Sequence, residues 1–155
     1  MFDMKKANEY FMKKALLQAT KSASEGEVPV GAVIVLDGKI IARGRNKREK
    51  TKNALSHAEI EAIDKACKKL KGWRLFECDM YVTLEPCPMC VGAIINSRIK
   101  NLYIGAMDKK SGAVGSVINL FEYPFNHKPK VEFGILEQQC SNILSDFFKE
   151  LRNKF

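Results

Sequence analysis

The chain has 155 residues, of which 46% are hydrophobic and 28% are charged. A chain of this size fits one compact domain, and we predict a single domain over residues 1–155. No apolar stretch is long enough to span a bilayer, and residues 1–14 are amphipathic, which excludes a membrane span and a signal peptide. Five cysteines without an export signal argue against a disulfide framework. We therefore expect a cytoplasmic protein in which a close cysteine pair serves a metal or catalysis.

The net charge is +8, from 26 Lys and Arg against 18 Asp and Glu. Charge bears on partners rather than on fold, and this balance favours polyanions. Six basic residues crowd the segment 43–52, where Glu49 is the single acid: Arg43, Arg45, Lys47, Arg48, Lys50 and Lys52. This clustering favours a polyanion-binding face over the alternative that the chain is merely rich in lysine.

The first predicted element is a helix over about residues 3–24, ended by Gly26. Five apolar residues recur at steps of four along this helix, and three more widen the apolar face: Ala7, Phe11, Ala15, Ala19 and Ala23, with Met4, Met12 and Leu16. Two β-branched runs within 28–44 follow, and the Asp37-Gly38 pair between them predicts a hairpin. The first run is apolar on both faces, as is typical of a strand with helices on each side.

A basic loop is predicted over residues 45–55, followed by a helix that begins near Ser56, as its N-cap, and ends at Gly72. Four residues of this helix are expected to face inward: Ile60, Ile63, Ala66 and Leu70. Residues 79–84 predict a strand. Pro86 and Pro88 suit the first turn of a helix that runs to about Ser97.

The remaining elements are a strand over residues 101–105, a glycine-bearing loop over 106–116 and a short strand over 131–135. A closing helix follows, with four residues on its apolar side: Leu144, Phe147, Phe148 and Leu151. Strands joined by crossover helices predict a three-layer α/β/α sandwich on a mixed central sheet.

Two short motifs carry the chemistry: His57-Ala58-Glu59, and Cys87 and Cys90 within the sequence PCPMC. Each motif lies where a helix is predicted to begin. Cysteines three apart on a first helical turn face the same way, and the helix dipole favours the thiolates that bind metal. His57 would add one nitrogen. Three ligands leave the fourth position of a tetrahedral Zn²⁺ open, which is typical of a catalytic site, so we predict one zinc per subunit.

The open position of such a site would hold a water that the metal converts to hydroxide near neutral pH. Glu59, two residues past His57, is the one carboxylate in these motifs placed to accept and deliver the proton. Taken alone, Glu59 could be a first-turn acid that complements the helix dipole. The other three cysteines are interpreted as small buried hydrophobic residues rather than ligands: Cys67, Cys78 and Cys140. His127 is interpreted as a surface imidazole.

The motifs resemble those of the bacterial tRNA-specific adenosine deaminases, which belong to the cytidine deaminase-like superfamily. The resemblance runs from about residue 7 to 148 and includes PVGAVIV (29–35), HAEI (57–60), YVTLEPCPMCVGAI (81–94), GAMDKKSGAVGS (105–116) and LSDFF (144–148). It implies conversion of the wobble adenosine of a tRNA anticodon to inosine. It also implies a homodimer with each site near the subunit boundary.

By the same resemblance, His57, Cys87 and Cys90 would bind zinc and Glu59 would shuttle protons while hydroxide attacks C6 of a flipped adenine. Asn46 would hydrogen-bond the purine edge, and its amide does offer both a donor and an acceptor. Asn is also a common loop residue. Ala58 would contact the substrate, and Asp108 would lie against the sugar of the flipped nucleotide.

Two alternatives stay open. A guanine or cytosine deaminase of the same fold would share both motifs but has no need of a polyanion-binding face, so segments 43–52 and 105–116 favour RNA. A catalytically silent RNA-binding subunit could use the zinc as a structural staple. The presence of Glu59 argues against that second class.

Overall fold

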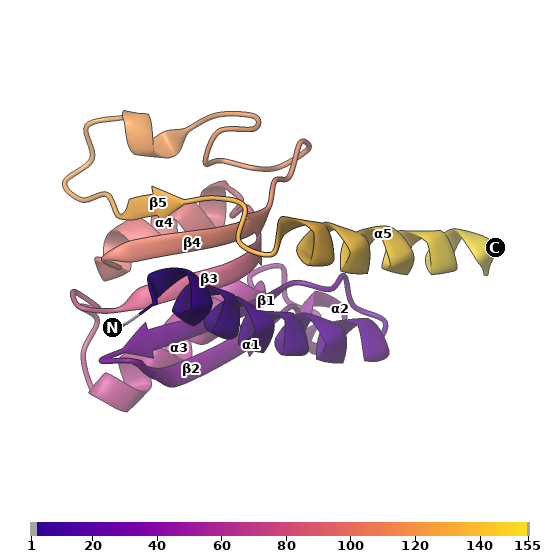
Figure 1. The fold of residues 1–155 in the computed structure, drawn as a ribbon, viewed down its shortest axis with the longest axis horizontal. Helices are drawn as coiled ribbons and strands as arrows, with labels where there is room; N and C mark the ends of the chain where they lie inside the picture. Colours follow the sequence, from indigo (N-terminus) through magenta and orange to yellow (C-terminus); the bar gives the residue numbers. More distant parts are fainter. Residues whose placement is uncertain (1–2, 155) are drawn as a thin grey trace.

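The computed structural model describes residues 3–154 and contains one five-stranded sheet with helices on both faces (Figure 1). Its strands are β1 (Gly31–Leu36), β2 (Lys39–Arg45), β3 (Asp79–Leu84), β4 (Asn101–Ala106) and β5 (Lys130–Glu132). They lie in the order β2-β1-β3-β4-β5. β1 pairs antiparallel with β2 and β3, whereas β3, β4 and β5 run parallel. The sheet is therefore mixed, as predicted.

The helices form the two outer layers. α1 (Met4–Ser24) and α5 (Glu137–Asn153) contact one face of the sheet, and α3 (Ala58–Leu70) and α4 (Pro88–Ser97) pack together on the other. Side chains of a strand alternate between the two faces. Ile34, Met80 and Ile104 thus join the core under α3 and α4, whereas Val33, Tyr81 and Tyr103 join the core under α1 and α5. The predicted three-layer α/β/α sandwich is confirmed.

Helix α1 forms where it was predicted, with Asp3 as its N-cap, but the predicted buried face is partly wrong. Met12, Ala15 and Ala19 are buried as expected, whereas Met4 is exposed. Polar residues of α1 are buried beside the three apolar ones. The Tyr81 hydroxyl donates a hydrogen bond to Asn8 (2.6 Å), and the Ser22 hydroxyl donates to the Asn46 carbonyl (2.8 Å). Because these polar groups are satisfied, they can be buried at little cost.

The hairpin of β1 and β2 is confirmed, with Asp37 and Gly38 both at positive φ (51° and 75°), as a type I′ turn requires. β1 is buried along almost its whole length, as predicted. At Gly44 on β2 a Cβ would overlap the Ala58 carbonyl and lie 2.7 Å from the Ala62 nitrogen. The start of α3 therefore rests directly on the backbone of β2.

The segment between β2 and α3 differs from the prediction. The predicted loop contains a short helix, α2 (Arg48–Thr51), and its first residue, Arg45, still belongs to β2. The N-cap of α3 is His57 rather than Ser56, whose hydroxyl instead accepts a hydrogen bond from Thr51 (2.8 Å).

The buried face of α3 also differs. Its buried residues are Ala58, Glu59, Ala62 and Ala66, whereas Leu70 is exposed and the two isoleucines are half-buried. Small side chains face the sheet here because the backbone of α3 lies so close to Gly44. Lys71, not Gly72, adopts the left-handed conformation that ends the helix.

The second half follows the prediction more closely. β3 and α4 have the predicted bounds, with Pro88 in the first turn of α4, and β4 extends one residue further to Ala106. β5 covers 130–132 rather than 131–135, and a short 3₁₀ helix, η1 (Leu120–Glu122), was not predicted. No helix in residues 3–154 is both long and apolar enough to cross a membrane.

Helix α5 buries less than its pattern suggests. Cys140 is buried, but Phe148 and Leu151 on the predicted apolar side are 40% and 41% exposed. Figure 1 shows the reason, since the C-terminal part of α5 extends past the edge of the sheet. This places the middle of α5 at the same end of the sheet as α2.

Candidate active site

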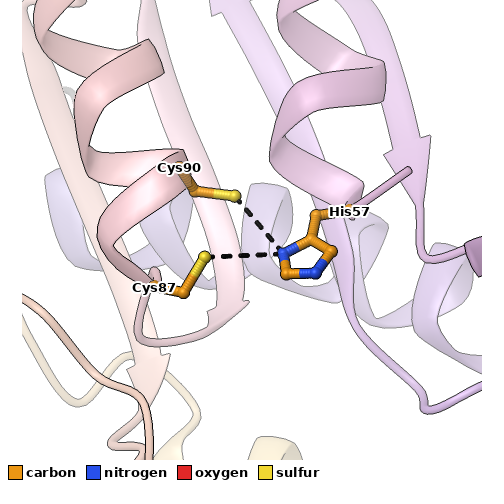
Figure 2. A group of neighbouring side chains, drawn as sticks. All are labelled: His57, Cys87 and Cys90. Carbon is orange, nitrogen blue, oxygen red and sulfur yellow. Dashed lines mark hydrogen bonds between the residues drawn. The ribbon is translucent and has the colours of Figure 1, made fainter. Parts of the chain in front are cut away.

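The site lies where the N-termini of α3 and α4 meet. His57 is the N-cap of α3, Cys87 is the N-cap of α4, and Cys90 lies in the first turn of α4. Figure 2 shows the three side chains pointing toward one another. The His57 Nδ1 atom lies 3.6 Å from the Sγ atom of Cys87 and 3.6 Å from that of Cys90. The structure thus brings together all three residues predicted as metal ligands.

This group has the dimensions of a metal site. Its three ligand atoms lie within 4.8 Å of one another. Ligands bonded to a tetrahedral zinc at roughly 2.0 Å (nitrogen) and 2.3 Å (sulfur) would be about 3.5 Å apart, which matches the two nitrogen–sulfur distances. Within residues 3–154 no other cluster of His, Cys, Asp and Glu meets the same condition. The donor set and its spacing fit zinc.

The remaining histidine and cysteines lie elsewhere. His127 contacts the Ile99 carbonyl through Nε2 (2.7 Å), Cys78 and Cys140 are buried, and Cys67 is half-buried. None of them belongs to the metal-binding group, in agreement with the sequence analysis.

Protonation of the two thiols is unequal. The hydrogen bond from Cys90, together with the one from His57, lowers the pKa of the Cys87 thiol to about 4. The contact with Cys87, together with burial, raises the pKa of Cys90. The hydrogen bond to Cys87 also raises the pKa of His57. The group therefore stabilises one negative charge by itself, and a divalent cation would supply the positive charge that two thiolates need.

Glu59 lies in the first turn of α3 and is only 3% exposed. Burial raises the pKa of its carboxyl group to about 7. A carboxyl with such a pKa exchanges its proton readily at neutral pH, which is the property that a general acid and base needs. Its position beside the metal-binding group, on the same turn as His57, is the one that the sequence predicted.

A cavity of about 560 Å³ opens over this group. Glu59 and the two motif residues His57 and Cys87 line it, together with Ala58, which is fully buried at the start of α3. A purine base is much smaller than this volume, so the cavity can also admit neighbouring atoms of a larger substrate. The cavity therefore places the buried carboxyl and the metal-binding group within one concave site.

The cavity wall is basic on two sides. Arg48, from α2, lies on one side, and Lys109 and Lys110 lie on the loop after β4. Leu144 and Phe148 of α5 add an apolar part to the wall. The sequence predicts Arg48 only as part of a basic segment, and Leu144 and Phe148 only as part of an apolar helix face. It assigns none of the three to the site.

Two of the six basic residues of segment 43–52 are paired with an acid that lies just after α1. Glu25 accepts hydrogen bonds from Arg45 (2.9 Å) and Lys50 (2.8 Å), and these two neighbours lower the pKa of Glu25 to about 2. The buried Glu27 carboxylate accepts the backbone N–H groups of Glu49 and Lys50 at the start of α2. The acids just after α1 therefore hold this segment in place.

Asn46 lines the cavity and is buried, but its amide is already engaged. Its Nδ2 donates to the Val28 carbonyl (3.1 Å), and its Oδ1 accepts from the Arg48 nitrogen (3.2 Å). An amide has two N–H donors and two acceptor lone pairs, so one of each stays available. Asn46 thus supports the wall of the cavity and retains one donor and one acceptor for a ligand.

Asp108 also lines the cavity, half-buried at the start of the loop after β4. Its Oδ1 accepts the backbone N–H groups of Lys110 (3.0 Å) and Ser111 (3.2 Å), which shapes the turn that carries the two lysines. Within residues 3–154 its second carboxylate oxygen accepts no hydrogen bond, so this oxygen is available to a ligand.

Glu85, between β3 and Cys87, is a cavity residue that the sequence analysis did not single out. It is 2% exposed. Burial by itself raises the pKa of Glu85, but hydrogen bonds from Ser116, Asp108 and Val114 outweigh it and hold the pKa below its usual value. The sequence carries no signal for this role, because the residues that bind the carboxylate are more than 20 positions away.

Comparison with known proteins gives one consistent family. The model of the MafB19-like deaminases matches residues 6–152. The tRNA-specific adenosine deaminase of Bacillus subtilis is 49% identical over 95% of this chain and 92% of its own length. This chain belongs to the tRNA-specific adenosine deaminases. Its membership in the cytidine deaminase-like fold and the resemblance seen in the motifs are thereby confirmed.

Two solved structures show how this adenosine deaminase family member relates to its neighbours. The first comes from work on A-to-I editing by tRNA:A34 deaminases. It matches this chain with a TM-score of 0.85 and 46% sequence identity, and the match covers 87% of this chain and 99% of the other chain. The second is a guanine deaminase from Bacillus subtilis. It matches with a TM-score of 0.63 and 35% sequence identity, and the match covers 94% of this chain and 93% of the other chain. The free-base enzyme shares the fold but is the more distant of the two.

Proposed function

We propose that this deaminase converts adenosine to inosine at the wobble position of a tRNA anticodon, with one zinc ion per subunit. The observation that carries the proposal is the cavity, which joins the His57, Cys87 and Cys90 group and the buried Glu59 to a wall bearing Arg48, Lys109 and Lys110. The acidic and metal-binding part suits deamination, and the basic wall suits a nucleotide that is still attached to its phosphates.

His57 Nδ1 and the two sulfurs would hold the zinc, as their spacing indicates. When bound, zinc lowers the pKa of a water molecule to near neutrality and so supplies a nucleophile for C6 of adenine. Both thiols have to be deprotonated to bind it, and their positions at the N-terminus of α4 favour the thiolates.

Glu59 would manage the protons of this hydrolysis. Its carboxylate accepts a proton from water and donates it to N1 of adenine, which makes C6 more electrophilic. Glu59 would then take the proton of the hydroxyl added at C6 and pass it to N6. The C6–N6 bond breaks as C6 becomes the carbonyl of inosine, and ammonia leaves. Burial serves this role because it holds the carboxyl pKa near 7, where both protonation states are accessible.

Asn46 and Asp108 would orient the nucleotide. Asn46 has one donor and one acceptor left for the purine edge, and Asp108 has one oxygen left for a sugar hydroxyl. Ala58 offers no side-chain polar group, so its part is to keep the base close to the start of α3 by its small size. An anticodon loop lowers the cost of extruding the base, since its bases are partly unstacked.

The test is a comparison of substrates under one set of conditions. An anticodon stem-loop with adenosine at the wobble position is incubated with the zinc-loaded enzyme, beside free guanine, adenosine and cytidine. Inosine formed in the RNA, with no turnover of the three small molecules, supports the proposal. Turnover of guanine with no change in the RNA would replace it with a free-base deaminase.

RNA affinity is expected to fall with salt, but less steeply than six basic residues would give. Arg48 is the basic residue of segment 43–52 that lines the cavity, so three phosphate contacts, from Arg48, Lys109 and Lys110, are the reasonable count. Three contacts to single-stranded RNA give a slope of log K against log salt of about −2, a loss of roughly 20-fold between 50 and 200 mM. Fluorescence anisotropy of a labelled stem-loop measures this slope.

Lys109→Ala should make that slope shallower by about 0.7, because one phosphate contact is lost. Lys69→Ala is the matched control, since Lys69 is an exposed lysine in the last turn of α3, away from the cavity. Equal slopes for K109A and the wild type would remove the loop after β4 from the RNA-binding surface.

The homodimer remains a prediction of the family resemblance, and the cytoplasmic location remains a prediction from the cysteine content and the amphipathic N-terminal sequence. A silent RNA-binding subunit is the other class that the sequence left open. The buried Glu59 beside the metal-binding group speaks against it, because a structural staple needs no carboxyl of raised pKa.

A further inference from the structure

A buried carboxylate that the proposed reaction does not use lies at the base of one cavity wall. Glu85 directly follows β3, which ends at Leu84, and lies two residues before Cys87. It is 2% exposed and belongs to no metal-binding group. A buried carboxylate costs free energy unless hydrogen bonds compensate for its desolvation, so its partners indicate what it is for.

Within residues 3–154, all the hydrogen-bond donors to the Glu85 carboxylate lie on one loop, residues 107–116, which follows β4. Oε1 accepts the N–H of Asp108 (2.9 Å), and Oε2 accepts the N–H groups of Val114 (2.9 Å) and Ser116 (3.1 Å). The Ser116 hydroxyl also donates to Oε1. The carboxylate therefore binds the start and the end of the loop at the same time.

The loop closes tightly around this carboxylate. At Gly112, in the middle of the loop, an added Cβ would overlap the Glu85 carboxylate. The backbone is fixed alongside, since Glu85 N–H donates to Ala106 (2.8 Å) and Ala113 N–H donates to Pro86 (2.9 Å). Glu85 is thus the centre around which residues 107–116 are folded.

The loop carries the residues that form one wall of the cavity. Lys109 and Lys110 lie between the two ends that Glu85 holds, and Asp108 is the residue that it binds at the first end. No strand or helix forms within residues 107–116, which have turn or irregular conformation apart from a single bridge at Val114. The shape of this wall accordingly depends on the hydrogen bonds to Glu85 rather than on regular secondary structure.

We propose that Glu85 is a positioning residue, whose carboxylate shapes the 107–116 loop so that Asp108, Lys109 and Lys110 meet the RNA substrate. The substrate in this statement rests on the proposed function, whereas the shaping of the loop does not. A direct catalytic part is excluded by its bonding. A carboxylate has about four acceptor positions, and four donors from the loop occupy those of Glu85.

Glu85→Gln tests this role with almost no change in side-chain size. Each carboxylate oxygen accepts two hydrogen bonds, so either orientation of the amide turns its NH₂ group toward two donors. We expect amide hydrogen exchange in residues 107–116 to become faster by on the order of tenfold or more, because charged hydrogen bonds are lost. Exchange in α3 and α4 and the zinc content should stay at their wild-type values.

The kinetic readout separates positioning from catalysis. We expect E85Q to raise KM for the stem-loop by on the order of tenfold, while kcat stays within about threefold, since the 107–116 loop carries neither Glu59 nor a residue of the metal-binding group. Asp79→Asn is the matched control. It removes a half-buried carboxylate from the other end of β3, where Asp79 accepts one hydrogen bond from Asn101 (2.7 Å).

Gly112→Ala disturbs the same contact from the loop side, without altering the residue near Cys87. It should reproduce the faster exchange of residues 107–116 and the higher KM. Wild-type exchange of this loop in both variants would overturn the proposal, as would a loss of zinc or a general increase in exchange in E85Q. If the wild type leaves RNA unchanged, the proposed substrate fails, whereas loop exchange in the same variants still decides the role of Glu85.

Discussion

Glu59→Gln is expected to lower kcat for the stem-loop by on the order of 10³-fold, because general acid and base catalysis contributes about that much. The amide keeps the shape of the side chain but can neither accept the proton from water nor pass one to adenine. Glu59 is not among the three residues with metal-binding geometry, so the variant should keep one zinc per chain. The measurement is inosine formation at saturating RNA, with zinc determined on the same sample.

Glu61→Gln is the control for this substitution. Glu61 is also an acid in the first turn of α3, but it does not line the cavity, so the same change of charge should leave turnover near the wild-type value. A variant at Glu59 that retains turnover would remove Glu59 from the reaction. Loss of zinc in that variant would show that Glu59 supports the metal rather than the protons.

His57→Ala is expected to lose both the metal and the activity. Nδ1 of His57 lies 3.6 Å from each sulfur, and without it two thiols remain, which is one ligand short of a catalytic zinc site. We expect less than about a tenth of the wild-type zinc after dialysis, and turnover lower by more than about 10³-fold, since the nucleophile is generated by the metal. Zinc analysis and the inosine assay measure the two effects.

His127→Ala provides the comparison, since His127 is the only other histidine. Its ring contacts a carbonyl away from the metal-binding group, so its removal should leave zinc and turnover unchanged. Treatment of the wild type with a chelator should abolish activity and added zinc should restore it, whereas H57A should not recover. Full zinc content in H57A would contradict the predicted ligand set.

The positions of helices and strands were predictable where strong local signals mark them. Asp37-Gly38 required a type I′ turn, and Pro88 could only occupy the first turn of α4, so β1, β2 and α4 lie as expected. The faces of α1 and α3 were less predictable. Alanine recurs on several sides of both helices, and burial was decided by distant partners, Tyr81 for Asn8 and Gly44 for Ala62.

The centre of the site was predictable from the two motifs, their expected places at helix N-termini and the family resemblance that they carry. His57, Cys87 and Cys90 lie at or just inside the N-termini of α3 and α4. These helices follow β2 and β3, which both run antiparallel to β1, so the two N-termini lie at the same end of the sheet. The walls were not predictable in this way. The hydrogen bonds of Glu85 join residues 23 to 31 positions apart, and nothing in the local sequence indicates which acid will be enclosed by a loop.

The basic segment illustrates the same limit. Six positive charges were visible in the sequence, but the pairing of two of them, Arg45 and Lys50, with Glu25 depends on how the end of α1 meets β2 and α2. Arg48 alone of these side chains is placed by the structure on the cavity wall without such a partner in residues 3–154. The count of charges thus overstated the surface available to RNA.

The most direct test of the account moves one adenosine within one RNA. Two stem-loops of equal composition are incubated with the zinc-loaded wild type, one with its single loop adenosine at the wobble position and the other with it one position away. The account predicts inosine at the wobble position only, found by sequencing as an adenosine read as guanosine. No inosine in either RNA, with free guanine consumed by the same sample, would contradict it.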